Sequence, residues 1–395
     1  MPTVVPGNTV GGVVVPSTAA PAGAFECVAS ASNFTYYTSG DLHTYPPAAT
    51  PLSTIASVFS GSRQITPDFF GMHVQQVANI SEAIQKVPFS IARCHDSSNG
   101  TRWHNLNPSN GVFDWTNSDA WVNAMYAAGK DICFLLGFTP DWAAASTPNT
   151  GKYDNGTTAR ATNQPPASTT YWDNFCTAIA TRYAGKIKYY EIWNEVNYTS
   201  YWSGTAAQLA VLVRRANQII KAIDPAAKIV APIVQEPETG GTGNAYLGSF
   251  LDASDSAAGT GKLWVDICGI HMYPPKYNYQ VHKNQIDNVA ATLAARSMSA
   301  TKIWNTETGI LEPSWGVSED VRAKWLKRAL LLAAALGVER YFWYSYDNVD
   351  MWMRPSQVAA WNEVRNLLLS GPITGCNIAP DGRVAATVNG VNVIY

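Results

Sequence analysis

The sequence predicts an α/β protein whose main part is a (β/α)8 barrel with a small β-rich accessory element built from the chain termini. From Asp68 onward, short apolar runs alternate with polar turns and helical stretches, which is typical of a parallel sheet covered by helices. Eight such runs occur, and eight parallel strands close a barrel. The 395 residues leave room for one barrel, of about 250 to 350 residues, and a small appendage.

The predicted strands and helices can be placed individually. The eight strand-like runs begin at Phe69, Phe89, Asp131, Tyr189, Lys228, Val265, Lys302 and Arg340. Two helices have clear ends, because one opens at Ser318 and stops at Gly337, and another opens at Pro355 and stops near Gly371. A doubly wound sheet would usually carry a Gly-rich phosphate loop after its first strand, and the sequence contains no such motif.

The segments outside the barrel differ in composition. Residues 1–24 are uncharged and rich in Pro, Gly, Val, Thr and Ala, which predicts a flexible linker or tail. Residues 25–62 contain short strand-like pieces broken by prolines, and we expect a β-rich segment or lid there. The barrel then occupies residues 63–371. Residues 372–395 predict a small β appendage beside the 25–62 segment, with turns at Asp381-Gly382 and Asn389-Gly390.

The composition excludes several classes of partner. Hydrophobic residues make up 46% of the chain and charged residues 14%, and the net charge is −2, so nothing indicates binding to nucleic acid or to an anionic membrane. The sequence has no apolar run long enough to span a bilayer and no signal peptide at its start. We expect a monomer that is secreted or attached to the cell envelope and whose export signal is absent from this chain.

The cysteines do not indicate a metal or redox centre, because none of the six forms a Cys-x-x-Cys pair. Three of them lie in predicted barrel strands, where a thiol behaves as a small hydrophobe; they are Cys94, Cys133 and Cys268. Cys27, Cys176 and Cys376 remain free to pair. We predict a disulfide between Cys27 and Cys376, because both flank the barrel, and this presumes an oxidising compartment.

Two strand ends deliver a glutamate. The stretch Tyr189–Asn197 runs from an apolar strand into Asn194 and Glu195, and Lys302–Gly309 ends with Glu307 just before a turn residue. Because the functional groups of a (β/α)8 barrel gather at the carboxyl ends of its strands, we expect the two carboxylates to face the same site. A carboxylate beside an amide suits acid/base chemistry on a polyhydroxylated ligand.

These motifs resemble those of the clan A glycoside hydrolases, and within the clan they look most like family 39. The fourth-strand motif of that family reads roughly Glu-x-Trp-Asn-Glu-Pro-Asp/Asn, and this chain matches it at Glu191, Trp193, Asn194, Glu195 and Asn197. Val196 stands where proline is usual. The resemblance implies a retaining enzyme in which Glu195 is the acid/base and Glu307 the nucleophile.

The resemblance implies further roles at other strand ends. Arg93 and Tyr273 would hold the carboxylate of Glu307, and Trp343 would form the aromatic floor of the sugar site. His271 is either a substrate contact or a histidine satisfied at the barrel rim. Weaker candidates for sugar contact, which could equally be loop packing, are His73, Trp142, Trp202, Trp103, Tyr198, Tyr277, Trp315 and Trp352. We expect Glu191 to make a structural ion pair.

The sequence therefore predicts a retaining glycoside hydrolase that cleaves a glycosidic bond in a polysaccharide or oligosaccharide by double displacement. Aromatic residues on loops at several sides of the barrel favour cleavage within a polymer rather than at its end. We expect carbohydrate as the partner, with no metal or organic cofactor. Two alternatives stay open: a transglycosylase using the same carboxylates, and a catalytically silent carbohydrate-binding barrel.

Overall fold

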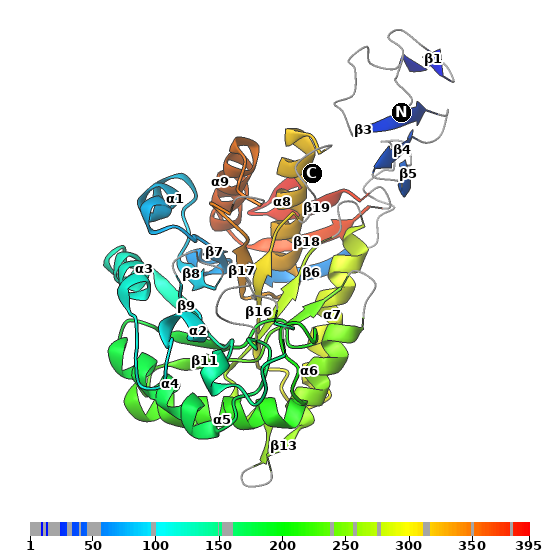
Figure 1. The fold of residues 1–395 in the computed structure, drawn as a ribbon. Coiled ribbons are helices and arrows are strands. Elements are labelled where there is room, and N and C mark those ends of the chain that lie inside the picture. The colour runs from blue at the N-terminus through cyan, green and yellow to red at the C-terminus, as the bar shows by residue number, and fades with distance from the viewer. Residues whose placement is uncertain are drawn as a thin grey trace.

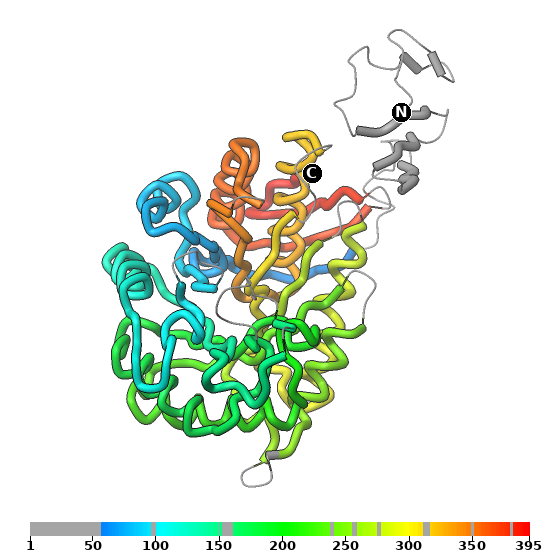
Figure 2. Tube along the Cα trace, viewed as in Figure 1, coloured from blue at the N-terminus to red at the C-terminus, as the bar shows by residue number. Residues whose placement is uncertain are grey.

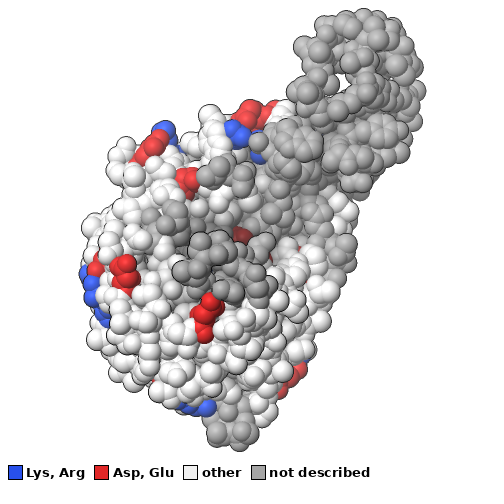
Figure 3. All heavy atoms as spheres, viewed as in Figure 1, with Lys and Arg blue, Asp and Glu red and all other residues white. Residues whose placement is uncertain are grey.

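The protein is described by a computed structural model in which a closed parallel barrel is surrounded by helices, as predicted (Figure 1). The described residues are 57–95, 100–148, 150–151, 161–237, 241–255, 259–274, 278–310, 317–348, 351–379 and 382–395, with the backbone of five short strands between residues 9 and 45. Among these residues, no helix is both long and apolar enough to cross a membrane. On the face drawn in Figure 3, charged side chains are few and scattered among uncharged ones.

The barrel strands follow one another around the ring in chain order. They are β7 (Phe70–Met72), β8 (Ile91–Cys94), β9 (Asp131–Leu136), β10 (Tyr189–Ile192), β11 (Lys228–Val230) with β12 (Val234–Glu236), β15 (Ile267–Met272), β16 (Lys302–Thr308) and β17 (Arg340–Trp343). All begin at or within two residues of the predicted starts. β17 pairs with β7, and the fifth position is shared, because β11 pairs with β10 while β12 pairs with β15.

The helices form the outer layer. They are α1 (Ile80–Lys86), α2 (Trp103–Leu106), α3 (Thr116–Ala127), α4 (Thr169–Arg182), α5 (Ala206–Ile223), α6 (Thr242–Asp252), α7 (Tyr279–Ala294), α8 (Glu319–Ala335) and α9 (Pro355–Leu369), with short 3-10 turns η2 (Pro67–Phe69), η3 (Val77–Asn79), η4 (Asp141–Ala143) and η5 (Gly261–Trp264). The Ser318 hydroxyl caps α8 by accepting from the Val321 N–H at 3.3 Å, and Gly337 follows the helix with a φ of 97°. Both predicted helix starts, Ser318 and Pro355, are confirmed.

Apolar side chains pack in two separate layers. A small cluster fills the inside of the barrel and includes Trp304 and Phe342, whereas a larger cluster lies between strands and helices and includes Tyr341 and Trp343. The alternation along β17 assigns successive residues to opposite faces. Gly71 of β7 has to be glycine, because a Cβ there would lie 2.6 Å from the Phe342 ring.

The accessory sheet pairs a strand that precedes the barrel with three strands that follow it. Its order is β20 (Val391–Ile394), β19 (Val384–Val388), β18 (Ile373–Ile378) and β6 (Ser57–Arg63), and all its pairs are antiparallel. Figure 2 shows the blue β6 beside the red strands at the other end of the chain. The sheet packs on α8, where Arg328 Nε donates to the Tyr395 carbonyl at 2.9 Å. This is the predicted β element from both termini.

The remaining strands are short and lie apart from the barrel sheet. β3 (Ala24–Ala29), β4 (Phe34–Thr38) and β5 (Asp41–Tyr45) form one antiparallel sheet, and two-residue strands pair as β1 (Thr9–Val10) with β2 (Val13–Val14) and as β13 (Ser254–Asp255) with β14 (Gly259–Thr260). The predicted 1–24 tail and most of the 25–62 segment therefore fall where the structure describes no side chains.

The predicted disulfide is wrong. Cys376 is a free thiol on β18 with 0% of its surface exposed, and burial raises its pKa to about 12. Cys376 is part of the hydrophobic core between the accessory sheet and the helices. Its strand, β18, is paired on both edges, with β19 and with β6. Cys27 lies among the residues whose side chains are not described. The other described cysteines are also buried, and none of them forms a disulfide.

Candidate active site

The chain turns sharply where β10 ends, and the turn carries Asn194 and Glu195. Trp193 and Glu195 have positive φ values of 62° and 44°, which cost about 1 to 3 kcal/mol each in non-glycine residues. Local contacts hold this turn. The Trp193 indole N–H donates to the Tyr201 carbonyl at 2.7 Å, and the Val196 N–H donates to the Ile233 carbonyl at 2.8 Å. Proline lacks this N–H, which gives Val196 a structural reason to depart from the family motif.

Arg93 on β8 ties three strands together below the barrel mouth. Its Nη1 donates to Glu307 Oε2 at 2.8 Å, its Nη2 donates to Asn194 Oδ1 at 2.9 Å, and its Nε donates to Glu191. The contact with Glu307 is the predicted one, and the pair with Glu191 is the predicted structural ion pair. Because Arg93 takes the amide oxygen of Asn194, the NH2 group of that amide is turned away from Arg93.

Burial controls the electrostatics of this network. Burial by itself would lower the pKa of Arg93, but the neighbouring Glu191 and Glu307 carboxylates outweigh it and raise that pKa. Burial raises the pKa of Glu191, and the Arg93 guanidinium opposes the shift. Removing one partner of such a buried pair leaves an uncompensated charge in the interior. Arg93 is therefore a permanent cation beneath the site.

Each carboxylate oxygen of Glu307 has a donor of its own. The Tyr273 hydroxyl donates to Glu307 Oε1 at 2.6 Å, while Arg93 occupies Oε2. Burial, and next the charge of Glu307, raise the pKa of Tyr273 well above its usual value, so the phenol stays protonated and remains a donor. Two donors favour the charged, unprotonated form of the Glu307 side chain and fix its orientation.

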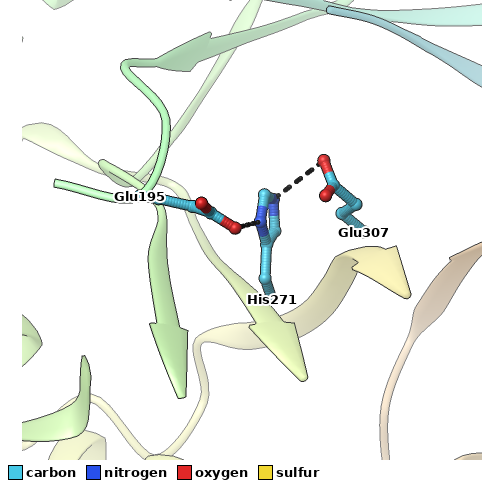
Figure 4. A group of neighbouring side chains, drawn as sticks. All are labelled: Glu195, His271 and Glu307. Carbon is cyan, nitrogen blue, oxygen red and sulfur yellow. Dashed lines mark hydrogen bonds and ion pairs between the residues drawn. The ribbon is translucent and has the colours of Figure 1, made fainter. Parts of the chain in front are cut away.

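His271 on β15 lies between the two glutamates. Figure 4 shows its imidazole between the carboxylates of Glu195 and Glu307. His271 Nδ1 is 3.0 Å from Glu195 Oε1, and Nε2 is 3.9 Å from Glu307 Oε2. One side-chain atom from each of the three residues lies within 4.8 Å of the other two. Glu195 and Glu307 are 9% and 8% exposed, so both carboxylates are largely buried.

The same three residues have the donor types of a metal site, but their bonding does not fit one. Both oxygens of Glu307 already accept short hydrogen bonds, and the Arg93 guanidinium 2.8 Å away would repel a second cation. Glu195 Oε1 is also bound to His271. The cluster is better suited to moving protons and to holding a carboxylate in place than to coordinating an ion.

His73 stabilises the strand that carries Glu307. It is 1% exposed, its Nε2 bonds the Thr306 carbonyl at 2.8 Å, and its ring lies 5.0 Å edge-on from Tyr344. The Tyr344 hydroxyl accepts from Gln75 Nε2 at 3.0 Å and from Asn348 Nδ2 at 3.1 Å. Sequence reasoning missed Tyr344 and Gln75. Tyr344 comes two residues after the inward-facing Phe342, but the sequence alone does not show which face of this run points inward.

Three predicted aromatic contacts are instead part of the packing. Trp343 is 1% exposed and faces the helices, because Phe342 takes the inward position on β17. Trp202 is 2% exposed and packs on the Trp193 ring at 4.7 Å, and Trp142 is half-buried with its Nε1 donating to the Asn107 carbonyl. The predicted roles of Trp343 and Trp202 as sugar contacts are therefore wrong, and Trp142 supports a loop.

The weaker candidates divide into three groups. Trp103 is fully buried and stacks on Phe175 in the core. Tyr198 and Trp352 are exposed, at 37% and 40%, on the loops after β10 and β17. Tyr277 and Trp315 lie outside the described residues. The structure thus brings together Asn194, Glu195, Glu307, Arg93, His271 and Tyr273 and leaves the tryptophans of the barrel wall out of the site.

Comparison with known proteins agrees with the barrel fold. Residues 70–229 match the model of glycosyl hydrolase family 10. A family 39 enzyme from Xanthomonas axonopodis pv. citri matches with a TM-score of 0.62 at 18% identity, over 86% of this chain and 77% of that one. A monomeric β-xylosidase from Caulobacter crescentus matches with a TM-score of 0.61 at 18% identity, over 84% of this chain and 75% of that one. A glucosidase from Croceicoccus marinus matches with a TM-score of 0.58 at 14% identity, over 84% of this chain and 76% of that one. At these identities the likeness shows a shared fold.

The fold is a (β/α)8 barrel with two glutamates facing each other at its strand ends. The chain is similar to clan A glycoside hydrolases, and the solved structures that it resembles include family 39 enzymes. The family model and the solved structures point to different families, and the clan is what they have in common. Together these findings support a glycosidase that acts on a carbohydrate.

Proposed function

We propose that the protein is a retaining glycoside hydrolase. The observation that carries this proposal is the distance between its two carboxylates, whose nearest side-chain atoms lie within 4.8 Å of each other. Retaining enzymes place their carboxyl groups about 5 to 5.5 Å apart, whereas inverting enzymes need roughly 6.5 to 9.5 Å to admit a water molecule between them and the sugar. The spacing here leaves room for direct attack by Glu307.

In the first step, Glu307 attacks the anomeric carbon while Glu195 gives its proton to the glycosidic oxygen, and the bond between that carbon and oxygen breaks. Arg93 and Tyr273 keep the Glu307 carboxylate charged and aimed at the sugar. The NH2 group of Asn194 is placed to bind a sugar hydroxyl next to the anomeric carbon. The product is a glycosyl ester on Glu307 and a free leaving sugar.

In the second step, Glu195 removes a proton from water, the water oxygen bonds to the anomeric carbon, and the Glu307 ester is released. His271 contacts Glu195 at 3.0 Å and can orient that carboxyl group through both steps. Two inversions restore the original anomeric configuration. Transglycosylation uses the same steps with a sugar hydroxyl in place of water, so the acceptor alone distinguishes the two reactions.

For the substrate we propose a neutral glycan that is cleaved within the chain, by an enzyme acting outside the cytoplasm. The solved relatives include a β-xylosidase and a glucosidase by name, and the surface in view carries few charges. A silent binding barrel is the less favoured function, because a module that only binds sugar has no need of a carboxylate whose two oxygens are both held by donors.

The stereochemical outcome tests the mechanism. The protein would be incubated with aryl β-xyloside and aryl β-glucoside, and the first-formed sugar would be followed by proton NMR. We expect the β-anomer to appear first and then to mutarotate. Initial release of the α-anomer would refute the retaining mechanism, and absence of release from these and from a panel of xylans, glucans, glycosaminoglycans and bacterial exopolysaccharides would favour the silent barrel.

A further inference from the structure

A pocket of about 640 Å³ lies beside the barrel mouth and is not used by the mechanism above. Its walls come from α1, from the loop after β17 and from the start of α9. The residues that matter for its chemistry are Glu82, Lys86, Tyr346, Asp347, Asn348 and Trp352. Of these, Trp352 has 40% of its surface exposed, so part of its indole is accessible at the pocket wall.

One face of the Trp352 ring is already occupied. The guanidinium carbon of Arg354 lies 4.1 Å from the ring centroid, which holds the indole in place. The ring nevertheless lines the pocket, so its remaining surface is offered to whatever enters. A flat aromatic surface fixed in this way is suited to stacking against the C–H face of a sugar ring.

The charged groups of the pocket already have partners. Lys86 is ion-paired with Glu82 one turn earlier on α1. The Asp347 carboxylate accepts from the backbone N–H groups of Gln75 and Gln76 at 2.7 and 2.8 Å, and from Asn79 Nδ2 at 3.0 Å. The described lining thus carries two carboxylates and one ammonium, a net charge of −1, and these groups are occupied by one another or by amides. Because they are occupied, the pocket favours an uncharged ligand with many hydroxyl groups over an ion.

Tyr346 adds an aromatic ring to this wall, and its hydroxyl is hydrogen-bonded to the Glu82 carboxylate. Burial, and next the Glu82 carboxylate, raise its pKa to about 12, so the phenol is protonated at neutral pH. Asn348 forms another part of the wall, and its Nδ2 donates to the Tyr344 hydroxyl at 3.1 Å. Tyr344 packs on His73, which holds the backbone next to Glu307. The pocket and the nucleophile are thus connected through a short chain of contacts.

The order of the strands fixes the direction in which a substrate would reach this pocket. β17 is the eighth strand of the ring and β10 the fourth, so the two lie opposite each other across the mouth, and β17 is next to the strand of Glu307. Glu195 on the β10 side must meet the leaving-group oxygen. The part of the substrate that stays bonded to Glu307 therefore extends toward β17.

We propose that this pocket is a distal subsite that binds a neutral pentose or hexose ring of the substrate, on the non-reducing side of the bond that is cleaved. The inference rests on the proposed function, since the direction of the substrate follows from the roles of Glu195 and Glu307. It adds a specific consequence, because substrates with a longer glycone should bind more tightly through Trp352.

The test compares aryl glycosides that share a leaving group and differ only in glycone length: 4-nitrophenyl β-xyloside with the β-xylotrioside, and the β-glucoside with the β-cellotrioside. Trp352→Ala should raise the KM of the trioside about tenfold, as the loss of one stacking contact predicts, and that of the monoside less than about twofold. Trp352→Tyr should restore most of the difference. Tyr126→Ala is the matched control, because Tyr126 is 51% exposed on α3, away from the mouth.

Equal KM changes for both lengths, or no change in either, would overturn the subsite while leaving the glycosidase intact. Calorimetry with xylotriose and cellotriose gives a readout that does not depend on turnover. If the wild-type protein cleaves none of the aryl glycosides, the proposed function fails, and the calorimetry still decides whether the pocket binds sugar. Equal affinity of wild type and Trp352→Ala for both trisaccharides, or no binding of either, would refute it.

Discussion

At the residue scale, the proposed mechanism requires its two carboxylates to be in different protonation states. Glu307 accepts from Tyr273 and Arg93, whereas the contact described for Glu195 is to His271, a group that exchanges protons readily. Environments that differ in this way are how one active site provides both a nucleophile and an acid. The roles follow from the neighbours of each glutamate, since the two side chains are chemically identical.

Replacing either carboxylate by an amide should abolish turnover without unfolding the protein. Glu307→Gln and Glu195→Gln should each lower kcat on an aryl glycoside by about 10²- to 10⁴-fold, because shape is kept and the charge or transferable proton is lost. The measurement is steady-state kinetics together with thermal melting. External azide should restore activity to Glu195→Ala with an activated substrate. Near-wild-type turnover in either amide variant would refute the assignment.

Arg93 combines a role in stability with a role in the site. Arg93→Ala should lower the free energy of unfolding by about 3 to 5 kcal/mol, because it leaves the buried Glu191 without its cation. Adding Glu191→Gln should recover part of that free energy but none of the turnover, since Glu307 still lacks its donor. Urea denaturation and kinetics on the single and double variants measure both quantities. A double variant no more stable than Arg93→Ala would contradict this account.

At the element scale, α7 is joined to the barrel by a neutral histidine. His282 Nδ1 donates to Gln285 Oε1 at 3.0 Å, and its Nε2 accepts from the Tyr341 hydroxyl at 3.2 Å. Gln285 continues the network to the Glu236 carbonyl at 2.8 Å. Burial lowers the pKa of His282 from 6.5 to about 4, because a charged imidazole would lose its hydration and turn an acceptor into a donor.

This histidine predicts a loss of stability in mild acid. Between pH 6.5 and 4 the unfolded chain binds a proton at His282 that the folded protein does not, so the free energy of unfolding falls as the pH falls, by about 3 kcal/mol over that range. Urea denaturation at a series of pH values measures the slope. His282→Gln should make the dependence of unfolding free energy on pH less steep. Part of the dependence should remain, because burial, and next Arg102, lower the pKa of His104 to about 3. An unchanged slope would show that His282 is not involved.

The element scale also explains what the sequence could and could not predict. The barrel strands were recognisable because apolar runs alternate with helices, and Glu195 and Glu307 were recognisable because polar residues interrupt those runs. Residues 340–344, which are β17 and the residue after it, read Arg-Tyr-Phe-Trp-Tyr, and no polar residue interrupts the run after Arg340. A parallel strand buried on both faces has no polar alternation to set its phase, so Trp343 and Tyr344 could not be assigned to a side. Trp202 was wrongly predicted to contact sugar for a similar reason, because aromatic residues of the loops can also pack beneath the mouth.

At the scale of the whole molecule, the arrangement of exposed aromatics favours an open cleft. Tyr198 follows β10 and Trp352 follows β17, and these strands lie on opposite sides of the ring, so the two side chains flank the mouth. An enzyme that removes single sugars needs a wall at one end. Contacts on both sides instead suit a polymer lying across the site.

Early digestion products should therefore be a mixture of oligosaccharides. With a soluble xylan or glucan that the enzyme accepts, viscosity should fall well before much reducing sugar has been released, because internal cuts shorten the polymer fastest. Viscometry and chromatography of the first products measure this. Release of monosaccharide at constant viscosity would overturn cleavage within the chain and would indicate a closed pocket.

The pairing of β6 with β18 has a consequence for how this protein is made. The two strands are separated by almost the whole barrel, since β6 covers Ser57–Arg63 and β18 covers Ile373–Ile378. At about 5 to 20 residues per second, a ribosome needs roughly 15 to 60 s between the two. Throughout that interval β6 has no partner in its own sheet and presents an open edge to other nascent chains. The synthesis of β18, rather than that of the barrel, sets when this edge is covered.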